Sequence, residues 1–362
     1  MNKKITGILE LDAVIDALNN KHKDKYANGI ISLGPGQQSV PRVPTGSISL
    51  DCGIGGGVPV GRIVEVYGVE SSGKTTCALN IVKSIQAHSE TLWPGVKRYA
   101  PIVDLEHSIS GDFLKSIGVD MENLLWIKPN TAEEAFQSMM DLTKTGHISV
   151  MLLDSIDAAQ SEAQLKKEIG ENEMGGISKI LSRTLREYSK VCDNTGTLAI
   201  FINQIRANPS PYSSPITTPG GNALKFYSSL RLQTLALKPS ANTANAGEMR
   251  IKVIKNKVSC PKFDEIKFDI VYGQGPDPFA DLMACAKNLG LIQFAGSSVK
   301  TKLTGKMEPL CSGGKAGLIA KLRAEPALFT QLAELCMTTA SQFTVPVEEA
   351  EEEEPDEPAV VV

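Results

Sequence analysis

The chain has 362 residues, more than one ordinary domain holds and suited to two or three. Hydrophobic residues make up 42% of it and charged residues 22%, a balance that excludes a mainly disordered, collagen-like or coiled-coil protein. No stretch approaches the roughly 20 apolar residues that a membrane span needs, and the seven cysteines form no CxxC pair. Glu10 and Asp12 cut short the apolar run of the basic N-terminal stretch, so we do not expect it to be a secretory signal. We therefore expect a cytoplasmic protein, and the scattered cysteines indicate neither disulfides nor a structural zinc site.

The net charge of −4 combines two unlike regions. Eight acidic residues and no Lys or Arg lie from Glu348 to the end, so residues 1–347 carry a net charge of +4. We expect residues 341–362 to form an acidic, disordered tail, which such a composition typically gives. The tail either serves solubility alone or mimics nucleic-acid charge and competes for a basic groove on the same chain.

Residues 1–44 are expected to form an N-terminal segment. Apolar residues recur at helical spacing from Ile8 to Leu18, and a Gly/Pro-rich connector follows over residues 32–44. The predicted helix packs either on its own domain or on a neighbouring subunit.

Residues 45–273 alternate between apolar strand-like runs and helical segments. Strands are predicted at residues 62–67, 99–104, 150–154, 198–203 and 230–237, and helices at residues 75–89, 132–143 and 176–194. This alternation predicts an α/β fold whose mostly parallel central sheet is covered on both faces. A hairpin at residues 248–257 and 263–272 is expected to extend the sheet.

Residues 274–340 differ in character from the preceding region. Helical patterns at residues 279–289, 315–322 and 329–337 flank a short, Gly-rich, basic middle. We interpret this region as a small α+β C-terminal domain.

The strongest chemical signal is a phosphate-binding loop. The pattern G-x-x-x-x-G-K-[ST] is formed by Gly68, Val69, Glu70, Ser71, Ser72, Gly73, Lys74 and Thr75. Because the loop joins a predicted strand to a predicted helix, its backbone N–H groups and the positive end of the helix would surround the phosphates of ATP. Lys74 is expected to reach the β- and γ-phosphates, and the Thr75 hydroxyl to bind Mg²⁺.

Three other strand ends supply candidate partners for this loop. Asp154 and Ser155 end an apolar strand, which predicts a carboxylate that holds Mg²⁺ through water. Glu106 ends another strand and is the candidate base that orients the attacking water, with a plain surface acid as the alternative. Gln204 ends a third strand, where its amide can sense the γ-phosphate and pass the difference to the following loop.

Two polar stretches are candidates for contact with nucleic acid. Residues 205–221 have no apolar period, which inside a compact domain indicates a functional loop, and residues 168–176 precede a helix that bears basic residues. Hydroxyls, amides, an Arg and an aromatic ring suit a nucleic-acid backbone and its bases. Met174 is either a wedge between bases or a core residue, and Tyr212 either contacts a base or packs within its own loop.

Seven segments resemble, in order and spacing, the RecA family of homologous recombinases: residues 45–51, 61–65, 70–76, 106–107, 201–206, 220–227 and 253–257. The stretch GGNALKFY at residues 220–227 is the most specific of them. The resemblance covers about residues 5–340 and implies a RecA-like core that forms a helical filament on single-stranded DNA, with ATP and Mg²⁺ bound between subunits. It further implies pairing with homologous double-stranded DNA, strand exchange, DNA-dependent ATP hydrolysis, and repressor and mediator proteins as partners.

The resemblance also implies roles for individual residues. Glu106 matches the catalytic glutamate, Gln204 the γ-phosphate sensor, and Lys255 and Lys257 two lysines that reach the neighbouring subunit's phosphates. Nucleotide contacts extend to Thr76, Asp154, Ser155 and Phe113, the last standing where the family has a Tyr near adenine. Residues 168–176 and 205–221 match two DNA loops. The DNA-binding candidates are Met174, Gly175, Gly176, Ser182, Arg186, Arg206, Asn208, Tyr212, Gly220, Gly221 and Asn222.

Other regions receive roles from the same resemblance. The N-terminal helix matches a segment that docks on the adjacent subunit, residues 274–340 a domain that guides duplex DNA, and the tail a regulatory one. A hexameric helicase or a RecA-like regulatory P-loop ATPase would use the same core, but a helicase would be expected to carry a large extra domain. A filament scaffold without turnover is a third alternative, against which an intact Glu106 argues.

Overall fold

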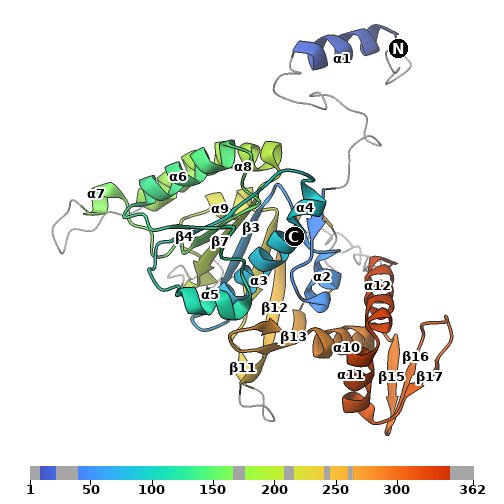
Figure 1. The fold of residues 1–362 in the computed structure, drawn as a ribbon. Helices are drawn as coiled ribbons and strands as arrows, with labels where there is room; N and C mark the ends of the chain where they lie inside the picture. The colour runs from blue at the N-terminus through green and yellow to red at the C-terminus, as the bar shows by residue number, and fades with distance from the viewer. Residues whose placement is uncertain are drawn as a thin grey trace, which may run out of the picture.

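The computed structural model describes residues 9–21, 40–165, 176–207, 216–239, 245–259, 263 and 265–342. Within this part of the chain, a ten-stranded sheet forms the centre of the fold (Figure 1). Its strands follow the spatial order β14 (Gly275–Pro276), β13 (Glu265–Val271), β12 (Ala246–Asn256), β10 (Leu230–Thr234), β3 (Ile63–Gly68), β7 (Leu198–Gln204), β6 (Val150–Asp154), β4 (Ala100–Asp104) and β5 (Leu124–Ile127), with β11 (Lys238–Pro239) paired to β12. The run from β10 to β5 is parallel, whereas β12, β13 and β14 pair antiparallel.

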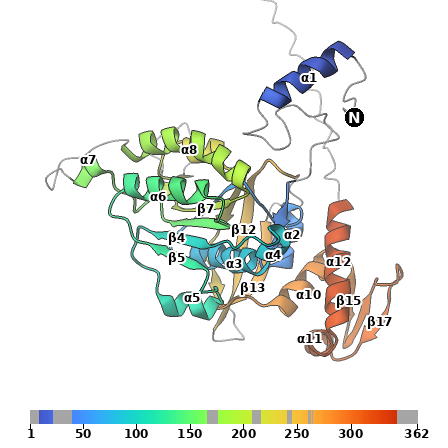
Figure 2. The same cartoon turned by 45° about the horizontal axis from the view of Figure 1, so that its top comes forward.

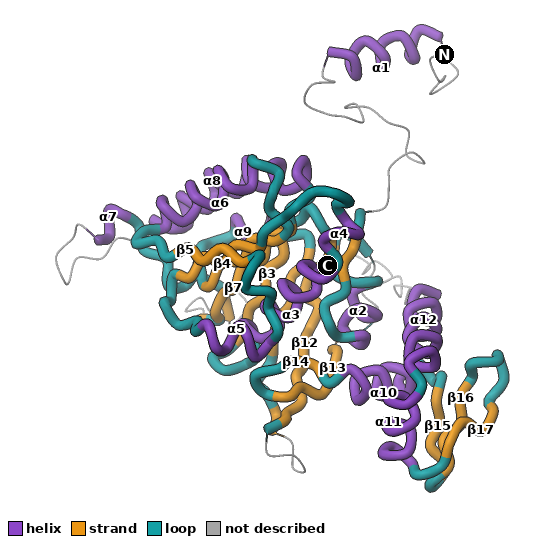
Figure 3. Tube along the Cα trace, in the orientation of Figure 1, coloured by secondary structure: helices purple, strands orange, loops and turns teal. Residues whose placement is uncertain are grey.

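Helices cover both faces of the sheet, as the continuous apolar strands predict. On one face, α3 (Lys74–Ala87) and α5 (Gly111–Ile117) pack on a core that includes Val64, Ile102 and Leu152. On the other face, α6 (Ala132–Lys144) and α8 (Gly176–Thr195) pack on a second core that includes Val103, Leu153 and Phe201. Full burial of each such apolar side chain contributes about 1.5–3 kcal/mol. Figure 3 shows the purple helices on either side of the orange sheet.

Polar caps define where several helices begin and end. Ser110 Oγ accepts the Phe113 N–H at 3.1 Å at the start of α5, and Thr131 Oγ1 accepts the Glu134 N–H at 3.1 Å at the start of α6. Gly118 ends α5 with a φ of 91°, a left-handed conformation that glycine adopts without a steric penalty. These hydrogen bonds satisfy backbone groups that a helix terminus leaves without partners.

The C-terminal part combines helices with a separate antiparallel sheet (Figure 2). Its elements are α10 (Pro278–Asn288), β15 (Ile292–Ala295), β16 (Ser298–Thr301), β17 (Glu308–Cys311), α11 (Gly314–Ala324) and α12 (Pro326–Gln342). Its apolar core extends to the helix α2 (Ile48–Ile54), since Cys52 packs there while Leu50 and Ile54 pack in the core beneath the large sheet. Thus α2 belongs to two hydrophobic cores at once.

The remaining described elements are the 13-residue helix α1 (Leu9–Lys21) and several short ones: β1 (Arg42–Val43), β2 (Val58–Pro59), α4 (Ser89–Leu92), α7 (Glu162–Leu165), β8 (Arg206–Ala207), β9 (Ile216–Thr217) and α9 (Ala223–Tyr227). On α1, Leu11 and Val14 are exposed, whereas Ile15 is buried. In the described ranges, no helix combines the length and the apolar character that crossing a bilayer requires. The residues predicted to form the acidic tail lie outside the described part from position 343 onward.

Strand boundaries differ from the sequence-based prediction at β10. The prediction extended this strand to residue 237, but β10 ends at Thr234, which pairs with Gly68 of β3. The parallel partner stops there because the chain turns into the phosphate loop, so β10 loses one neighbour at that point. The edge strand β5 was not predicted.

Candidate functional site

The phosphate loop turns tightly between β3 and α3, and two glycines make this turn possible. A Cβ atom on Gly68 would lie 2.3 Å from the backbone oxygen of Thr234, too close for any side chain. Gly73 has a φ of 82°, in the left-handed region that disfavours other residues. Ser72 is buried, and its Oγ donates to the Val69 carbonyl at 2.7 Å and lies 2.7 Å from Thr234 Oγ1. Val69, Glu70 and Ser71 remain exposed at the mouth of the loop.

Lys74 and Thr75 stand at the first turn of α3, with Thr76 next along the helix. Lys74 Nζ donates to the Val69 carbonyl at 2.8 Å. Burial lowers the pKa of Lys74, while the charges of Asp154 and Glu106 act in the opposite direction. Thr75 Oγ1 donates to Asp154 Oδ2 at 2.9 Å, so the predicted metal hydroxyl and carboxylate lie side by side. This set of oxygen ligands fits Mg²⁺, which prefers carboxylate, hydroxyl and phosphate oxygens.

Asp154 lies almost fully buried at the end of β6 and has Glu106 as a neighbour. Burial, followed by the charge of Glu106, raises the pKa of Asp154 to about 7. Ser155 Oγ donates a short hydrogen bond to Glu106 Oε1, and the Leu105 N–H donates to the Asp154 carbonyl at 2.8 Å. The side chain of Glu106 is therefore held at the metal side of the loop and is exposed to solvent.

Gln204 ends β7 directly beside the loop, because its register partner in β3 is Gly68. Its N–H donates to Asn203 Oδ1 at 3.0 Å. The structure thus brings Lys74, Thr75, Asp154, Glu106 and Gln204 together at the carboxyl ends of adjacent parallel strands, where ligands bind in open α/β sheets. Phe113 lies on α5, partly buried against the core beneath α3.

The candidate DNA residues of the first loop lead into α8. Gly176 begins this helix, and Ser182 and Arg186 lie exposed along it, with Ser182 Oγ donating to the Ser178 carbonyl at 2.7 Å. A groove of about 750 Å³ is lined by Lys179, Ser182, Arg183, Arg186 and Lys190 together with Ser178 and Glu187. Met174 and Gly175 lie outside the described residues.

The second loop returns to the core next to the start of α8. A groove of about 280 Å³ is lined there by residues of both predicted DNA loops, among them Gly176, Arg206 and Gly220. Arg206, whose side chain is 64% exposed, pairs with Asp157 at 2.6 Å. Asn208 and Tyr212 are outside the described residues.

Two glycines allow this close return of the chain. A Cβ atom on Gly220 would lie 2.5 Å from Leu181 Cδ1, and one on Gly221 would lie 3.0 Å from Ser178 Oγ. Both residues also have a positive φ, of 86° and 71°. The next residue, Asn222, precedes α9 and its carbonyl accepts the Phe226 N–H at 3.0 Å. The Gly-Gly-Asn sequence therefore joins the loop to α9 against the surface of α8.

Lys255 lies on β12 and contacts α9 rather than the phosphate loop. Its Nζ donates to the carbonyls of Lys225 at 2.5 Å and Phe226 at 3.1 Å. Burial, with a smaller effect of the Lys257 charge, lowers the pKa of Lys255 to about 8. Lys257 follows the end of β12, where its N–H donates to the Ser229 carbonyl at 2.8 Å.

Sequence reasoning gave no role to two polar residues beside this site, Glu65 and Arg231. It recognised the polar strand end Asn203-Gln204 but assigned the role there to Gln204 alone. Glu65 and Asn203 are fully buried, and Glu65 Oε2 lies 2.5 Å from Arg231 Nε. The available signal was the charged Glu65 inside the apolar strand IVEVYG, because a charge is buried only when a partner compensates it.

A strand–loop–helix that can surround phosphates, with a carboxylate and a hydroxyl placed for Mg²⁺, defines a P-loop nucleoside triphosphatase. The family model for the RecA N-terminal domain matches residues 12–277. The chain is 39% identical to Protein RecA of Nocardia farcinica (78% of this chain, 80% of that one) and 38% identical to Protein RecA of Thermus thermophilus (79% and 83%). It is 37% identical to Protein RecA of Heliobacterium modesticaldum over 89% of this chain and 91% of the other.

The chain therefore belongs to the RecA family. As a member, it is a DNA-dependent ATPase and homologous recombinase of DNA repair and the SOS response that uses ATP with Mg²⁺. It binds single- and double-stranded DNA and forms helical homo-oligomeric filaments. These relatives are all named Protein RecA, and the similarity covers most of their length. They do not support the helicase and regulatory-ATPase alternatives.

Proposed function

We propose that ATP is hydrolysed at a composite site, with one protomer supplying the phosphate loop and its neighbour supplying Lys255 and Lys257. The observation that carries this proposal is that Lys255, on β12, donates to backbone carbonyls of α9 and not to the phosphate loop of its own chain. An exposed apolar side chain belongs to one of these partners, since Phe226, whose carbonyl accepts from Lys255, is 68% exposed. A lysine beside an uncovered apolar surface is expected where a second copy of the chain packs.

On the loop side, each group has a separate task. The loop from Gly68 to Thr76 surrounds the phosphates, with Lys74 transferring its hydrogen bond from the Val69 carbonyl to phosphate oxygen. The Thr75 hydroxyl, and Asp154 through water, would hold Mg²⁺, which when bound neutralises phosphate charge. Glu106, oriented by Ser155, positions the attacking water, and Phe113 contacts the adenine. Gln204 senses the γ-phosphate from its position beside Gly68.

On the lysine side, the positive charges stabilise the negative charge that develops on the transferred phosphoryl group. Lys255 and Lys257 then act as catalytic residues of the neighbouring protomer's site. Hydrolysis at each site consequently requires contact between two protomers, which links turnover to the assembled filament.

Single-stranded DNA binds between the two loops in this proposal. The groove shared by Gly176, Arg206 and Gly220 supports a common binding surface. Arg186 and Arg206 neutralise phosphates, while exposed backbone and hydroxyl groups donate hydrogen bonds to the DNA backbone. The proposed contacts are Met174, Gly175, Gly176, Ser182, Arg186, Arg206, Asn208, Tyr212, Gly220, Gly221 and Asn222.

The flanking regions complete the assembly. The segment 1–44 docks through α1 on the adjacent protomer, in keeping with the exposed Leu11 and Val14. The core 45–273 carries the ATPase, residues 274–340 guide duplex DNA, and the tail 341–362 regulates access to it. The protein acts in the cytoplasm, where repressor and mediator proteins are its further partners.

Mixing two inactive variants tests the composite site. Glu106→Ala lacks the loop side and Lys255→Ala the lysine side, so each alone hydrolyses ATP slowly. In a random equal mixture, about a quarter of interfaces pair one intact side from each variant, and about a quarter of the wild-type rate returns. A mixture of Lys255→Ala with Lys257→Ala is the matched control and stays inactive. Failure of the first mixture to recover activity, while both variants still form filaments by electron microscopy, would contradict the composite site.

A further inference from the structure

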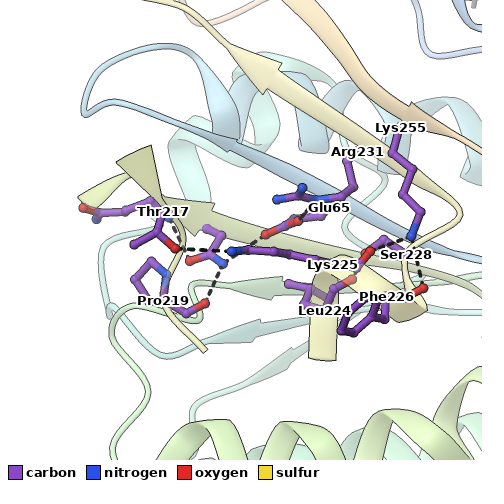
Figure 4. A network of polar contacts seen from close by, with 11 residues as sticks. Glu65, Thr217, Pro219, Leu224, Lys225, Phe226, Ser228, Arg231 and Lys255 are labelled. Carbon is purple, nitrogen blue, oxygen red and sulfur yellow. Dashed lines mark hydrogen bonds and ion pairs between the residues drawn. The ribbon is translucent and has the colours of Figure 1, made fainter. Parts of the chain in front are cut away.

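Four polar side chains form a row across adjacent strands of the large sheet, and Figure 4 labels three of them, Glu65, Arg231 and Lys255. We call Asn203 of β7, Glu65 of β3, Arg231 of β10 and Lys255 of β12 the polar row. The register pairs Arg231 with both Glu65 and Lys255, and it places Asn203 opposite Tyr67, two residues after Glu65. The row thus connects the strand that ends in Gln204 with the strand that bears Lys255.

Glu65 is the centre of the polar row. Its side chain is fully buried, and each carboxylate oxygen accepts a hydrogen bond. Oε2 accepts from Arg231 Nε at 2.5 Å and Oε1 from Asn203 Nδ2 at 3.1 Å. The Arg231 guanidinium also lies over the Tyr67 ring, 4.7 Å from its centroid. Because a buried ion that loses a partner is strongly penalised, these groups are held in one arrangement.

One end of the polar row holds the last part of the second DNA loop, and the other end holds the helix α9 that follows this loop. At one end, Asn203 Nδ2 donates to the Pro219 carbonyl at 3.1 Å, while Asn203 Oδ1 accepts the Gln204 N–H at 3.0 Å. At the other end, Lys255 Nζ donates to the carbonyls of Lys225 and Phe226.

A further contact joins α9 directly to the last part of the second DNA loop. Lys225 Nζ, on α9, reaches back to Thr217 Oγ1 at 3.2 Å. The loop exit and α9 are therefore joined to each other as well as to the polar row.

We propose that Glu65 and Asn203 are positioning residues that couple the γ-phosphate sensor and the trans lysine to the second DNA loop. The inference rests on the proposed roles of Gln204, Lys255 and that loop. A shift of Gln204 at the phosphate moves the backbone beside Asn203, and Asn203 transmits it to Pro219. A shift of α9 when DNA binds to the loop moves the two carbonyls that orient Lys255. Glu65 makes the two ends respond together, because neither neighbour can leave it without exposing an unpaired buried group.

Glu65→Gln tests this linkage with little change of shape. Asn203 and Arg231 both donate to Glu65, but a glutamine offers one carbonyl oxygen and one NH₂ group, so a donor must face a donor. Asn203→Leu is the second variant, which removes the hydrogen bonds of Asn203 with Glu65, Pro219 and Gln204 while Arg231 remains the ionic partner of Glu65. Thr143→Val is the matched control, because it removes a different buried hydrogen bond, that to Tyr188 Oη at 3.1 Å.

The readout is the ratio of affinities for a fluorescent oligothymidylate measured with a non-hydrolysable ATP analogue and with ADP. We expect Glu65→Gln and Asn203→Leu to reduce this ratio by about tenfold, within the range of ordinary coupling between two sites. DNA stimulation of ATP hydrolysis falls in parallel. Thr143→Val lowers the melting temperature and leaves the ratio at the wild-type value, since loss of stability alone weakens both complexes equally.

Two outcomes overturn the inference in distinguishable ways. If wild-type protein shows a nucleotide-dependent ratio and both folded variants share it, the polar row does not carry the coupling, while the proposed function stands. If the wild-type ratio is itself close to one, the proposed sensor role of Gln204 fails and the inference fails with it. Should Glu65→Gln not fold, Asn203→Leu alone decides the question.

Discussion

The hydroxyl of Thr75 donates a hydrogen bond of 2.9 Å to Oδ2 of Asp154, which joins the first turn of α3 to the end of β6. The hydrogen bond therefore connects the helix that follows the phosphate loop with the strand that carries the carboxylate. The neighbouring residue, Lys74, donates to the Val69 carbonyl instead. Its ammonium group thus contacts the same loop that is proposed to bind phosphate.

Lys74→Ala is expected to abolish DNA-stimulated ATP hydrolysis. Removing the ammonium group takes away a positive charge at the β- and γ-phosphates, and loss of one such stabilising donor typically costs about 10²–10³-fold in rate. Phosphate release in the presence of single-stranded DNA measures the effect. Lys83→Ala, at an exposed position of the same helix, is the control and retains the wild-type rate. Normal turnover in Lys74→Ala would refute the phosphate-loop assignment.

Glu106→Ala is expected to separate assembly from chemistry. The variant should still form filaments on single-stranded DNA with ATP, because the groups that hold phosphate and metal remain. Hydrolysis slows by about 10²–10⁴-fold, the usual contribution of a general base. Electron microscopy follows the filaments and phosphate release follows the rate, with the exposed Glu122→Ala as control. Rapid hydrolysis by Glu106→Ala would remove Glu106 from the role of base.

Stability is expected to fall as pH rises from about 4 to 7, the interval between the unfolded and folded pKa values of two buried carboxyls. Burial raises the pKa of Asp51 to about 7 and that of Asp281 to about 6. A raised carboxyl pKa means that the folded chain keeps protons which the unfolded chain has released, so the contribution is largest at low pH and disappears on ionisation. A difference of one between the folded and unfolded pKa values of a carboxyl corresponds to about 1.4 kcal/mol in the free energy of unfolding.

Asp281→Asn provides the test of this pH dependence. An asparagine oxygen can still accept from the Ser49 N–H, as Asp281 does at 3.4 Å, but it cannot ionise. Melting temperatures measured at pH 5 and pH 8 should therefore differ less in the variant than in the wild type. An equal difference in both proteins would exclude Asp281 as a source of the effect.

Deletion of residues 348–362 is expected to strengthen binding of duplex DNA at a given salt concentration and to lower the Mg²⁺ that binding needs. The eight acidic side chains repel DNA phosphates, and salt screens this repulsion. Duplex affinity measured across a salt series tests the idea. A control tail of equal length, with Gln and Asn in place of the acids, separates charge from length and should behave as the deletion does. Unchanged affinity at every salt concentration would leave the tail with a role in solubility alone.

Local patterns predicted most of the fold because the parallel strands are buried on both faces. Residues 150–154 and 198–203, predicted as strands, are β6 and β7 with one residue of difference at the end of β7. The edge strand β5 escaped prediction because all four of its residues are only half-buried, and a short run beside irregular chain gives no period.

The orientation of the paired lysines depends on a feature without a sequence signal. A spacing of two predicts that Lys255 and Lys257 share a face, but not which face of the sheet this is. The register between β10 and β12 shifts between Arg231 and Leu232, so that Lys255 pairs with Arg231 and Val253 with Leu232. This bulge leaves Lys255 opposite Arg231, the ionic partner of Glu65. Such pairings join residues more than 160 positions apart in some cases, as Glu65 and Arg231 do, and only the folded sheet reveals them.

The double membership of α2 limits how the gene for this protein can be shortened. One side of this seven-residue helix, with Leu50 and Ile54, lies in the core beneath the large sheet, and Cys52 lies among the C-terminal helices. Expressing the ATPase portion alone would uncover Cys52 and leave Ser49 without its contact to Asp281. A shortened version that stays monodisperse on a sizing column therefore needs new polar residues on that side of α2.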